Sequence, residues 1–273
     1  MLDSRIGRWF KMDAEFSKLP NLSPYGYVNN NPLLFIDPDG NFLIDVHKRI
    51  TSMAFAHSKL IQTTKNYQVV EKYRKAIVGY GLFDGSVAAP DKRSLPWPIG
   101  GGQESVHKEH FDSMNYTQII ANFQRINKNI DDLMGIYSKK LIDSESLGNS
   151  IGEDFHAVQD FYSHSNFIEL YEKVYGQTEL SKIPTLQDAL SQKEHKKFAA
   201  LLKKELKTGE YPGEGEGSHK KINHDLGKGS AYEKFDFVVE EVKGKDVNWF
   251  SRAAEEVATK ATKQLNDKIE SKL

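Results

Sequence analysis

The chain reads Gly152-Glu-Asp-Phe-His-Ala-Val-Gln-Asp-Phe-Tyr-Ser-His-Ser-Asn-Phe-Ile-Glu169 near its centre, and this segment is the most informative part of the sequence. It contains no Pro and no Gly after its first residue, so it predicts a helix. His156, Asp160 and His164 follow one another at four-residue intervals. Each such step advances about 400° around an α-helix, so the three side chains form a stripe on one face. Two imidazoles and a carboxylate so arranged indicate a metal site; the alternative is a hydrogen-bonded network in the core.

Apolar residues recur at helical spacing along most of the chain after residue 40. The sequence predicts helices over residues 44–78, 116–140, 144–175, 185–207 and 247–272. Pro and Gly residues mark loops at 79–102 and 209–229. Thr185, followed by Asp188 three positions later, predicts a helix N-cap. We therefore expect the region 41–273 to be mostly or wholly α.

The composition limits the classes of function. Charged residues make up 27% of the chain and the formal net charge is -1, which gives no electrostatic argument for nucleic-acid binding. The chain has no cysteine, so a zinc ion would have to be bound by His, Asp and Glu. The N-terminus carries charges at once and lacks the apolar run of a signal peptide. Export would therefore use a route without an N-terminal signal.

The first forty residues differ from the rest because Pro, Gly, Asn and aromatic residues dominate them. Three motifs, Asp3-Ser-Arg-Ile-Gly-Arg-Trp, Ser23-Pro-Tyr-Gly-Tyr-Val-Asn-Asn-Asn-Pro and Ile36-Asp-Pro-Asp-Gly, resemble the closing motif of the RHS/YD-repeat core. In that family a β-cocoon precedes a variable toxin domain. The resemblance implies a short β- and turn-rich RHS remnant at 1–40 and a toxin domain at 41–273. It also implies a delivered or secreted effector with a cognate immunity protein as its partner.

The toxin domain in turn resembles the zinc-dependent phospholipase C and S1/P1 nuclease superfamily, within it the HET-C-like branch. The resemblance is carried by residues 152–169 and by Ser218-His-Lys-Lys-Ile-Asn-His-Asp. It implies an α-helical bundle that binds two or three Zn²⁺ ions. Matched by position, the metal ligands are His47, Asp91, His110, His156, Asp160 and His164. A late His-x-x-x-Glu pair of the family is missing, and Glu169 or His219 is expected in its place.

Several of these assignments have alternatives. His110 is preferred to His107 because it alone precedes Phe-Asp, and His219 is preferred to His224. The remaining alternatives are that His47 faces solvent at a helix start, that Asp91 is a turn residue, and that Glu169 is a surface group.

The resemblance implies an enzyme that hydrolyses phosphodiester bonds, with Asp91 orienting or deprotonating the attacking water. A phospholipid membrane surface is the expected substrate, because the sequence of residues 152–169 resembles the HET-C-like form and the net charge of the chain is not basic. The alternatives are a P1-like nuclease and a non-catalytic, metal-stabilised domain that disrupts membranes or binds a partner.

Overall fold

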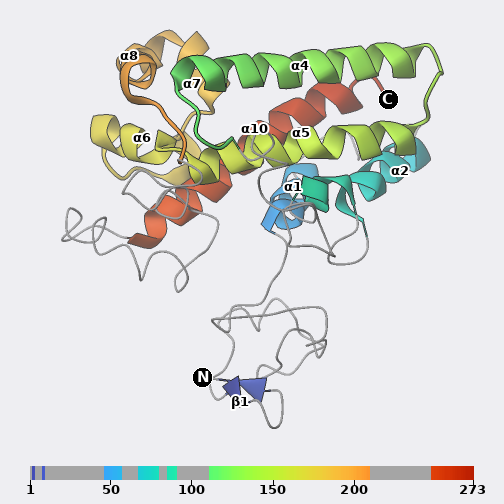
Figure 1. The fold of residues 1–273 in the computed structure, drawn as a ribbon, viewed down its shortest axis with the longest axis horizontal. Coiled ribbons are helices and arrows are strands. Elements are labelled where there is room, and N and C mark those ends of the chain that lie inside the picture. Colours follow the sequence, from blue (N-terminus) through green and yellow to red (C-terminus); the bar gives the residue numbers. More distant parts are fainter. Residues whose placement is uncertain are drawn as a thin grey trace.

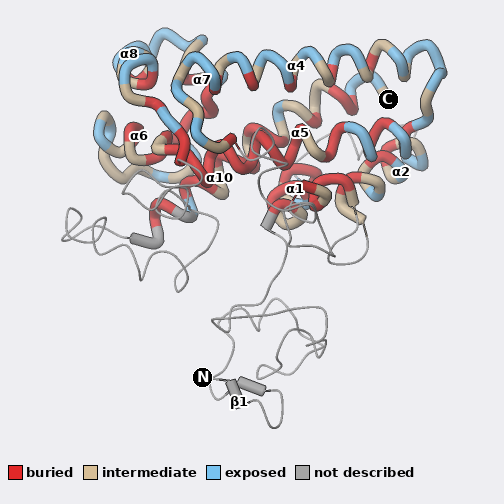
Figure 2. Tube along the Cα trace, viewed as in Figure 1, coloured by how far each residue is buried: buried red, intermediate tan, exposed pale blue. Residues whose placement is uncertain are grey.

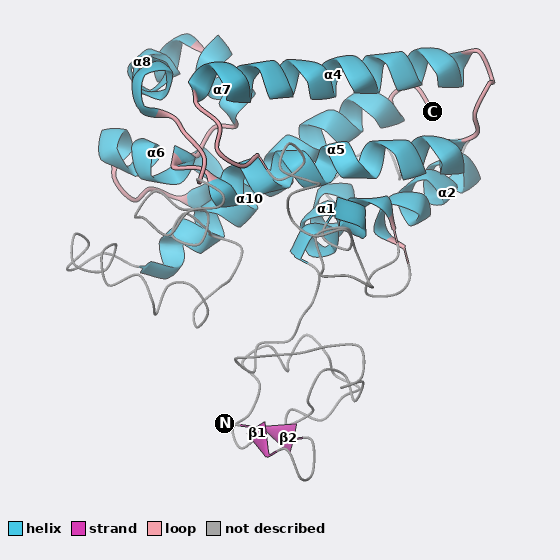
Figure 3. Cartoon of the chain, in the orientation of Figure 1, coloured by secondary structure: helices cyan, strands magenta, loops and turns pink. Residues whose placement is uncertain are grey.

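The computed structural model describes residues 2–3, 8–9, 46–56, 67–79, 85–90, 111–209 and 247–273. Helices make up most of these residues, which confirms the expectation of a mostly α chain (Figures 1 and 3). The α-helices are α1 (Val46–Ala56), α2 (Tyr67–Val78), α4 (Tyr116–Ser138), α5 (Ser144–His164), α6 (Phe167–Tyr175), α7 (Leu186–Ser191), α8 (Lys196–Glu205) and α10 (Val247–Glu270). Three 3-10 helices are η4 (Ser86–Ala88), η6 (Leu180–Lys182) and η7 (Lys193–His195).

Helix α5 lies at the centre of the packing. It contacts α1, α2, η4, α4 and α10. Every residue from Asp154 to His164 is buried, and Figure 2 shows this half of α5 in red. Because neighbouring elements cover the helix on all sides, its polar side chains face other protein groups instead of water.

Helix α4 runs antiparallel to α5 and covers one side of it (Figure 1). Its bounds agree with the predicted helix 116–140, and its apolar stripe is buried through Ile119, Ile126, Ile130 and Met134. The helix begins after Asn115, whose side chain accepts a hydrogen bond from Gln118 N at 3.1 Å. The Gln118 side chain in turn accepts from Asn115 N at 2.9 Å, which completes a capping box.

The single helix predicted over 144–175 is wrong, because the chain breaks between α5 and α6. Ser165 has an extended backbone, with φ -115° and ψ 161°, and forms an isolated antiparallel bridge with Thr208. The backbone N–H of Asn166 donates to Lys207 O at 3.1 Å, and its side chain bonds two further backbone groups of the same segment. These hydrogen bonds to a distant segment replace the intrahelical ones and turn the chain.

Two other predicted helices contain more than one element. The range 44–78 includes α1 and α2, and residues 57–66 between them lie outside the described part of the chain. The range 185–207 contains α7, η7 and α8, because Gln192 adopts an extended backbone that ends α7. Thr185 caps α7 as predicted: its hydroxyl oxygen accepts from Asp188 N at 3.2 Å.

Two short strands are described near the N-terminus. β1 (Leu2–Asp3) pairs antiparallel with β2 (Arg8–Trp9), with Leu2 opposite Trp9. The other residues assigned to an RHS remnant lie outside the described part, so this assignment stays a prediction. Among the described helices, none is long and apolar enough to cross a lipid bilayer.

Candidate metal centre

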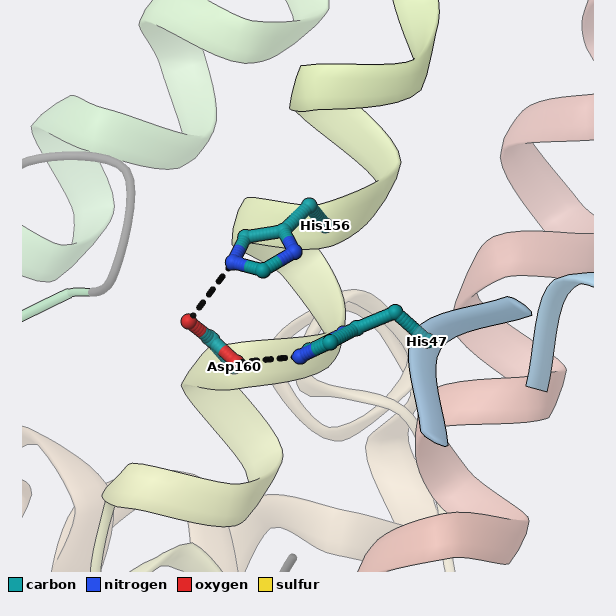
Figure 4. Close-up of side chains that lie close together, drawn as sticks. All are labelled: His47, His156 and Asp160. Atoms are coloured by element: carbon teal, nitrogen blue, oxygen red, sulfur yellow. Dashed lines mark ion pairs between the residues drawn. The ribbon is translucent and has the colours of Figure 1, made fainter. Parts of the chain in front are cut away.

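Three buried side chains from two helices meet at the C-terminal half of α5 (Figure 4). His47 comes from the first turn of α1, and His156 and Asp160 lie one turn apart on α5. His47 Nε2 lies 3.1 Å from Asp160 Oδ1, and His156 Nε2 lies 3.1 Å from Asp160 Oδ2. The two imidazole rings are 3.9 Å apart between centroids. The carboxylate therefore lies between two Nε2 atoms, one at each oxygen.

The backbone of η4 fixes the orientation of the His156 ring. His156 Nδ1 lies 2.9 Å from Val87 O, a carbonyl oxygen that can only accept a hydrogen bond. Nδ1 therefore carries the proton and donates it. In the neutral ring, Nε2 then holds a lone pair, and this lone pair faces Asp160.

This donor set fits a bound cation. The lone pair of His156 Nε2 and the anionic oxygen of Asp160 repel each other at 3.1 Å unless a proton or a metal ion lies between them. His47, His156 and Asp160 each offer one ligand atom, and these atoms all lie within 4.8 Å of one another. Imidazole nitrogen and carboxylate oxygen are both common ligands of divalent metals in proteins. The three residues could therefore bind a metal ion.

Two glycines on the same face of α5 allow η4 and α2 to approach the helix. Gly148 and Gly152 precede His156 at four-residue intervals. A methyl group added at Gly152 would lie 2.6 Å from Val87 N, and one at Gly148 would lie 2.4 Å from Tyr73 O. Ser86 donates a hydrogen bond from its hydroxyl to Gly148 O at 2.7 Å. This contact holds η4 against α5 and places the Val87 carbonyl at His156.

The other side of α5 carries a buried carboxyl group that faces α4. Asp154 Oδ2 accepts a hydrogen bond from Asn129 Nδ2 at 2.6 Å, and Arg125 lies 3.9 Å from the other carboxylate oxygen. Burial raises the pKa of Asp154 to about 6, although the hydrogen bond and the Arg125 charge oppose the rise.

The structure places the remaining predicted ligands as follows. His164 follows Asp160 by one turn, and its Nδ1 lies 3.9 Å from Asp160 Oδ2. Glu169 lies in the first turn of α6, beyond the break at Ser165. His47 is only 5% exposed, so the solvent-facing alternative for this residue is wrong. Five candidate residues lie outside the described part of the chain: Asp91, His107, His110, His219 and His224.

Sequence reasoning missed the groups that orient the two imidazoles. Gln159 accepts at His47 Nδ1, and the Val87 carbonyl accepts from His156. Every residue has a backbone carbonyl, so the sequence cannot show which one orients a side chain. Gln159 gave a weak signal, because it is a polar residue next to Asp160 on the predicted helix.

No protein family, curated protein or solved structure matches this chain. The geometry of the site and the quoted motifs are therefore the grounds on which a function can be argued.

Proposed function

We propose that this chain is a zinc-dependent phosphodiester hydrolase that acts as a delivered toxin, with membrane phospholipids as its substrate. One observation carries the proposal: His47, His156 and Asp160 form a buried three-donor group. Two of its members belong to the helical segment whose sequence resembles the HET-C-like branch of zinc phospholipases C. A buried carboxylate between two imidazoles is costly without a cation, so the group is more readily explained by a metal than by core packing.

Zinc is the metal that this chemistry favours. The chain has no cysteine, and a His/Asp donor set with further ligands supplied by loops suits a catalytic zinc site. Bound zinc supplies Lewis-acid chemistry: it polarises a phosphoryl oxygen, lowers the pKa of water and balances developing negative charge.

The residues would divide this work between holding the metal and positioning the reactants. His156 and Asp160 would hold zinc from α5, and His47 would hold it from α1. By resemblance, four further positions complete a site of two or three ions: Asp91, His110, His164, and either Glu169 or His219. Asp91 would also orient the attacking water and accept its proton.

The substrate proposal favours phospholipid over nucleic acid. A nuclease usually gains affinity by neutralising several phosphates with Lys and Arg, whereas this chain has a formal net charge of -1. The toxin proposal rests on the RHS-like motifs of residues 1–40. It includes delivery to a target cell and protection of the producer by an immunity protein.

A hydrolysis assay with two substrates tests the proposal. Purified protein, chelated and then restored with zinc, would be given phosphatidylcholine vesicles and single-stranded DNA in parallel reactions. His156→Ala removes one ligand, and His195→Ala is the matched control because that residue lies on η7, in contact with Tyr175. We expect zinc-dependent release of the phosphorylated headgroup that is lost in His156→Ala and kept in His195→Ala.

Other results would change the conclusion. Cleavage of DNA alone would assign the chain to the nuclease branch. Zinc that stays bound while neither substrate is cut would refute the enzyme proposal and favour a non-catalytic, metal-stabilised domain.

A further inference from the structure

Gln159 lies next to Asp160 on α5 and contacts two other helices. Its side-chain Oε1 is 2.9 Å from His47 Nδ1 on α1. Its Nε2 donates to Thr51 Oγ1 at 2.8 Å and to Thr262 Oγ1 on α10 at 3.2 Å. The side chain is fully buried, so these contacts are made without competition from water.

The orientation of this amide follows from the hydrogen bonds of Thr51. A hydroxyl group has one proton to donate, and Thr51 donates it to the backbone carbonyl of His47 at 2.7 Å. Toward Gln159 the Thr51 oxygen can then only accept. The amide NH₂ group must therefore point at Thr51, and the amide oxygen must point at His47.

The amide orientation in turn decides the tautomer of His47. The amide oxygen has no proton, so the 2.9 Å contact with Nδ1 is a hydrogen bond only if Nδ1 carries one. In the neutral ring the lone pair is then on Nε2, the atom that lies 3.1 Å from Asp160 Oδ1. A ring with the opposite tautomer would place an N–H where a metal ion would have to bind.

We infer that Gln159 is the positioning residue of His47: it fixes the imidazole tautomer whose Nε2 lone pair faces Asp160, where the proposed metal ion would bind. Val87 O does the same for His156 with a backbone carbonyl, so both imidazoles are prepared for a cation before one binds. Gln159 also ties this orientation to α10 through Thr262. The inference rests on the proposed function, because the lone pair on Nε2 has a role only if a metal ion binds there. The protonation of Nδ1 itself can be observed in metal-free protein.

The experiment compares the His47 tautomer with zinc affinity in the full chain. Long-range ¹H–¹⁵N correlation spectra of chelated protein report whether Nδ1 of His47 carries a proton. Zinc affinity is measured by competition with a chromophoric chelator. Gln159→Met removes the acceptor at nearly constant volume. We expect His47 to lose its preference for the Nδ1–H tautomer and zinc affinity to fall about 10- to 100-fold.

Two threonine variants separate orientation from packing. Thr51→Val removes the acceptor that orients the amide, so it should shift the His47 tautomer in the same direction as Gln159→Met. It also serves if Gln159→Met fails to fold. Thr262→Val is the matched control: it removes a contact to the same Nε2 at 3.2 Å but leaves the amide orientation set by Thr51, so the tautomer should stay unchanged.

The outcomes distinguish this inference from the proposed function. If Gln159→Met and Thr51→Val both keep the wild-type tautomer and zinc affinity, Gln159 does not position His47, although the metal site stands. If the wild-type chain binds no zinc but its His47 tautomer depends on Gln159, the inference stands and the metal-dependent function is refuted.

Discussion

At Gly152 the backbone of α5 passes so close to η4 that one methyl group would collide with it. An added Cβ would lie 2.0 Å from Ser86 Oγ and 2.6 Å from Val87 N. The Ser86 side chain could rotate, but a backbone nitrogen can move only with the whole of η4. Because η4 provides the carbonyl that orients His156, the effect should reach the candidate metal centre.

Gly152→Ala should therefore destabilise the fold and weaken metal binding together. We expect a loss of about 1–3 kcal/mol in the free energy of unfolding from overpacking, partly offset by the better helix propensity of Ala. Zinc affinity should fall as Val87 O moves away from His156 Nδ1. Urea unfolding and zinc competition measure the two effects.

Gly135 offers a matched control in the last turn of α4. A methyl group added there meets no atom within 4 Å. Gly135→Ala should therefore stabilise the protein by about 0.5–1 kcal/mol through helix propensity alone. Equal effects of the two substitutions would contradict the steric role of Gly152.

Asp154 gives the stability of the fold a predictable dependence on pH. Its pKa in the folded state is raised to about 6 from an ordinary value of 3.8, so the folded state binds the proton more tightly than the unfolded state does. The carboxylate therefore destabilises the fold above about pH 6. This cost falls as the pH drops toward about 4, where the carboxyl group is protonated in the folded state and increasingly so in the unfolded state.

Asp154→Asn should remove this cost while its amide oxygen still accepts from Asn129. In the presence of a chelator, we expect the variant to be more stable than wild type by up to about 3 kcal/mol near pH 8, from about two pKa units. The difference should shrink to a few tenths of a kcal/mol near about pH 4. Urea unfolding of both proteins across this range is the measurement, and a difference that does not vary with pH would show that Asp154 is not the titrating group.

At the scale of elements, hydrogen bonds to a distant segment hold the break between α5 and α6, and one side chain makes two of them. Asn166 Nδ2 donates to Glu205 O at 3.0 Å, and its Oδ1 accepts from Lys207 N at 2.9 Å. The same segment donates from Gly209 N to the backbone carbonyl of His164 at 2.8 Å, and His164 is the last residue of α5. The 205–209 segment thus fixes the end of α5.

Asn166→Ala should lower the free energy of unfolding by about 1–3 kcal/mol, since two side-chain hydrogen bonds are lost at about 0.5–1.5 kcal/mol each. Thermal and urea unfolding would measure the loss. Asn149→Ala serves as the control, because Asn149 is exposed on α5, where Ala is the better helix former. An equal response of the two variants would show that the Asn166 contacts do not hold the break.

The elements that could be predicted from the sequence are those fixed by local pattern. Helix α4 has a regular apolar stripe, and its observed start agrees with the prediction while its end lies within two residues of it. The break at Ser165 could not be predicted, because neither Ser nor Asn forbids a helix. It results from a bridge to Thr208, which is a tertiary contact.

In the candidate site, too, the features set by local spacing could be predicted and those set by tertiary contacts could not. The spacing of His156 and Asp160 predicts that both face one side of α5, and the structure brings them together. His47 was assigned by resemblance, since nothing in its own segment indicates a partner on a helix more than a hundred residues away. Gln159 was missed because its role depends on contacts with three other residues, and none of these follows from spacing.

At the scale of the whole molecule, the site forms only where distant parts of the chain pack together. Helices α1 and α10 both pack against α5 and against each other. Arg49 on α1 binds Glu255 on α10 through two hydrogen bonds of 2.9 and 3.0 Å. Thr51 on α1 and Thr262 on α10 meet at the same amide of Gln159. The candidate metal-binding group of His47, His156 and Asp160 therefore depends on the packing of α1, α5 and α10.

A metal ion bound by His47 and α5 would connect elements far apart in the sequence and stabilise the folded state as a whole. At a free zinc concentration about 1,000 times the dissociation constant, binding adds about 4 kcal/mol to the free energy of unfolding. For a domain of this size that corresponds to a rise in Tm of about 8–16 °C.

Differential scanning calorimetry of chelated and zinc-loaded protein would test this whole-molecule effect. The rise in Tm should be largely absent in His156→Ala and present in full in His195→Ala, whose substitution leaves the donor group intact. The effect should also depend on zinc concentration, because it comes from binding to the folded state. A zinc-induced rise of the same size in His156→Ala would mean that zinc binds elsewhere, and that the buried group on α1 and α5 is not the site that stabilises this fold.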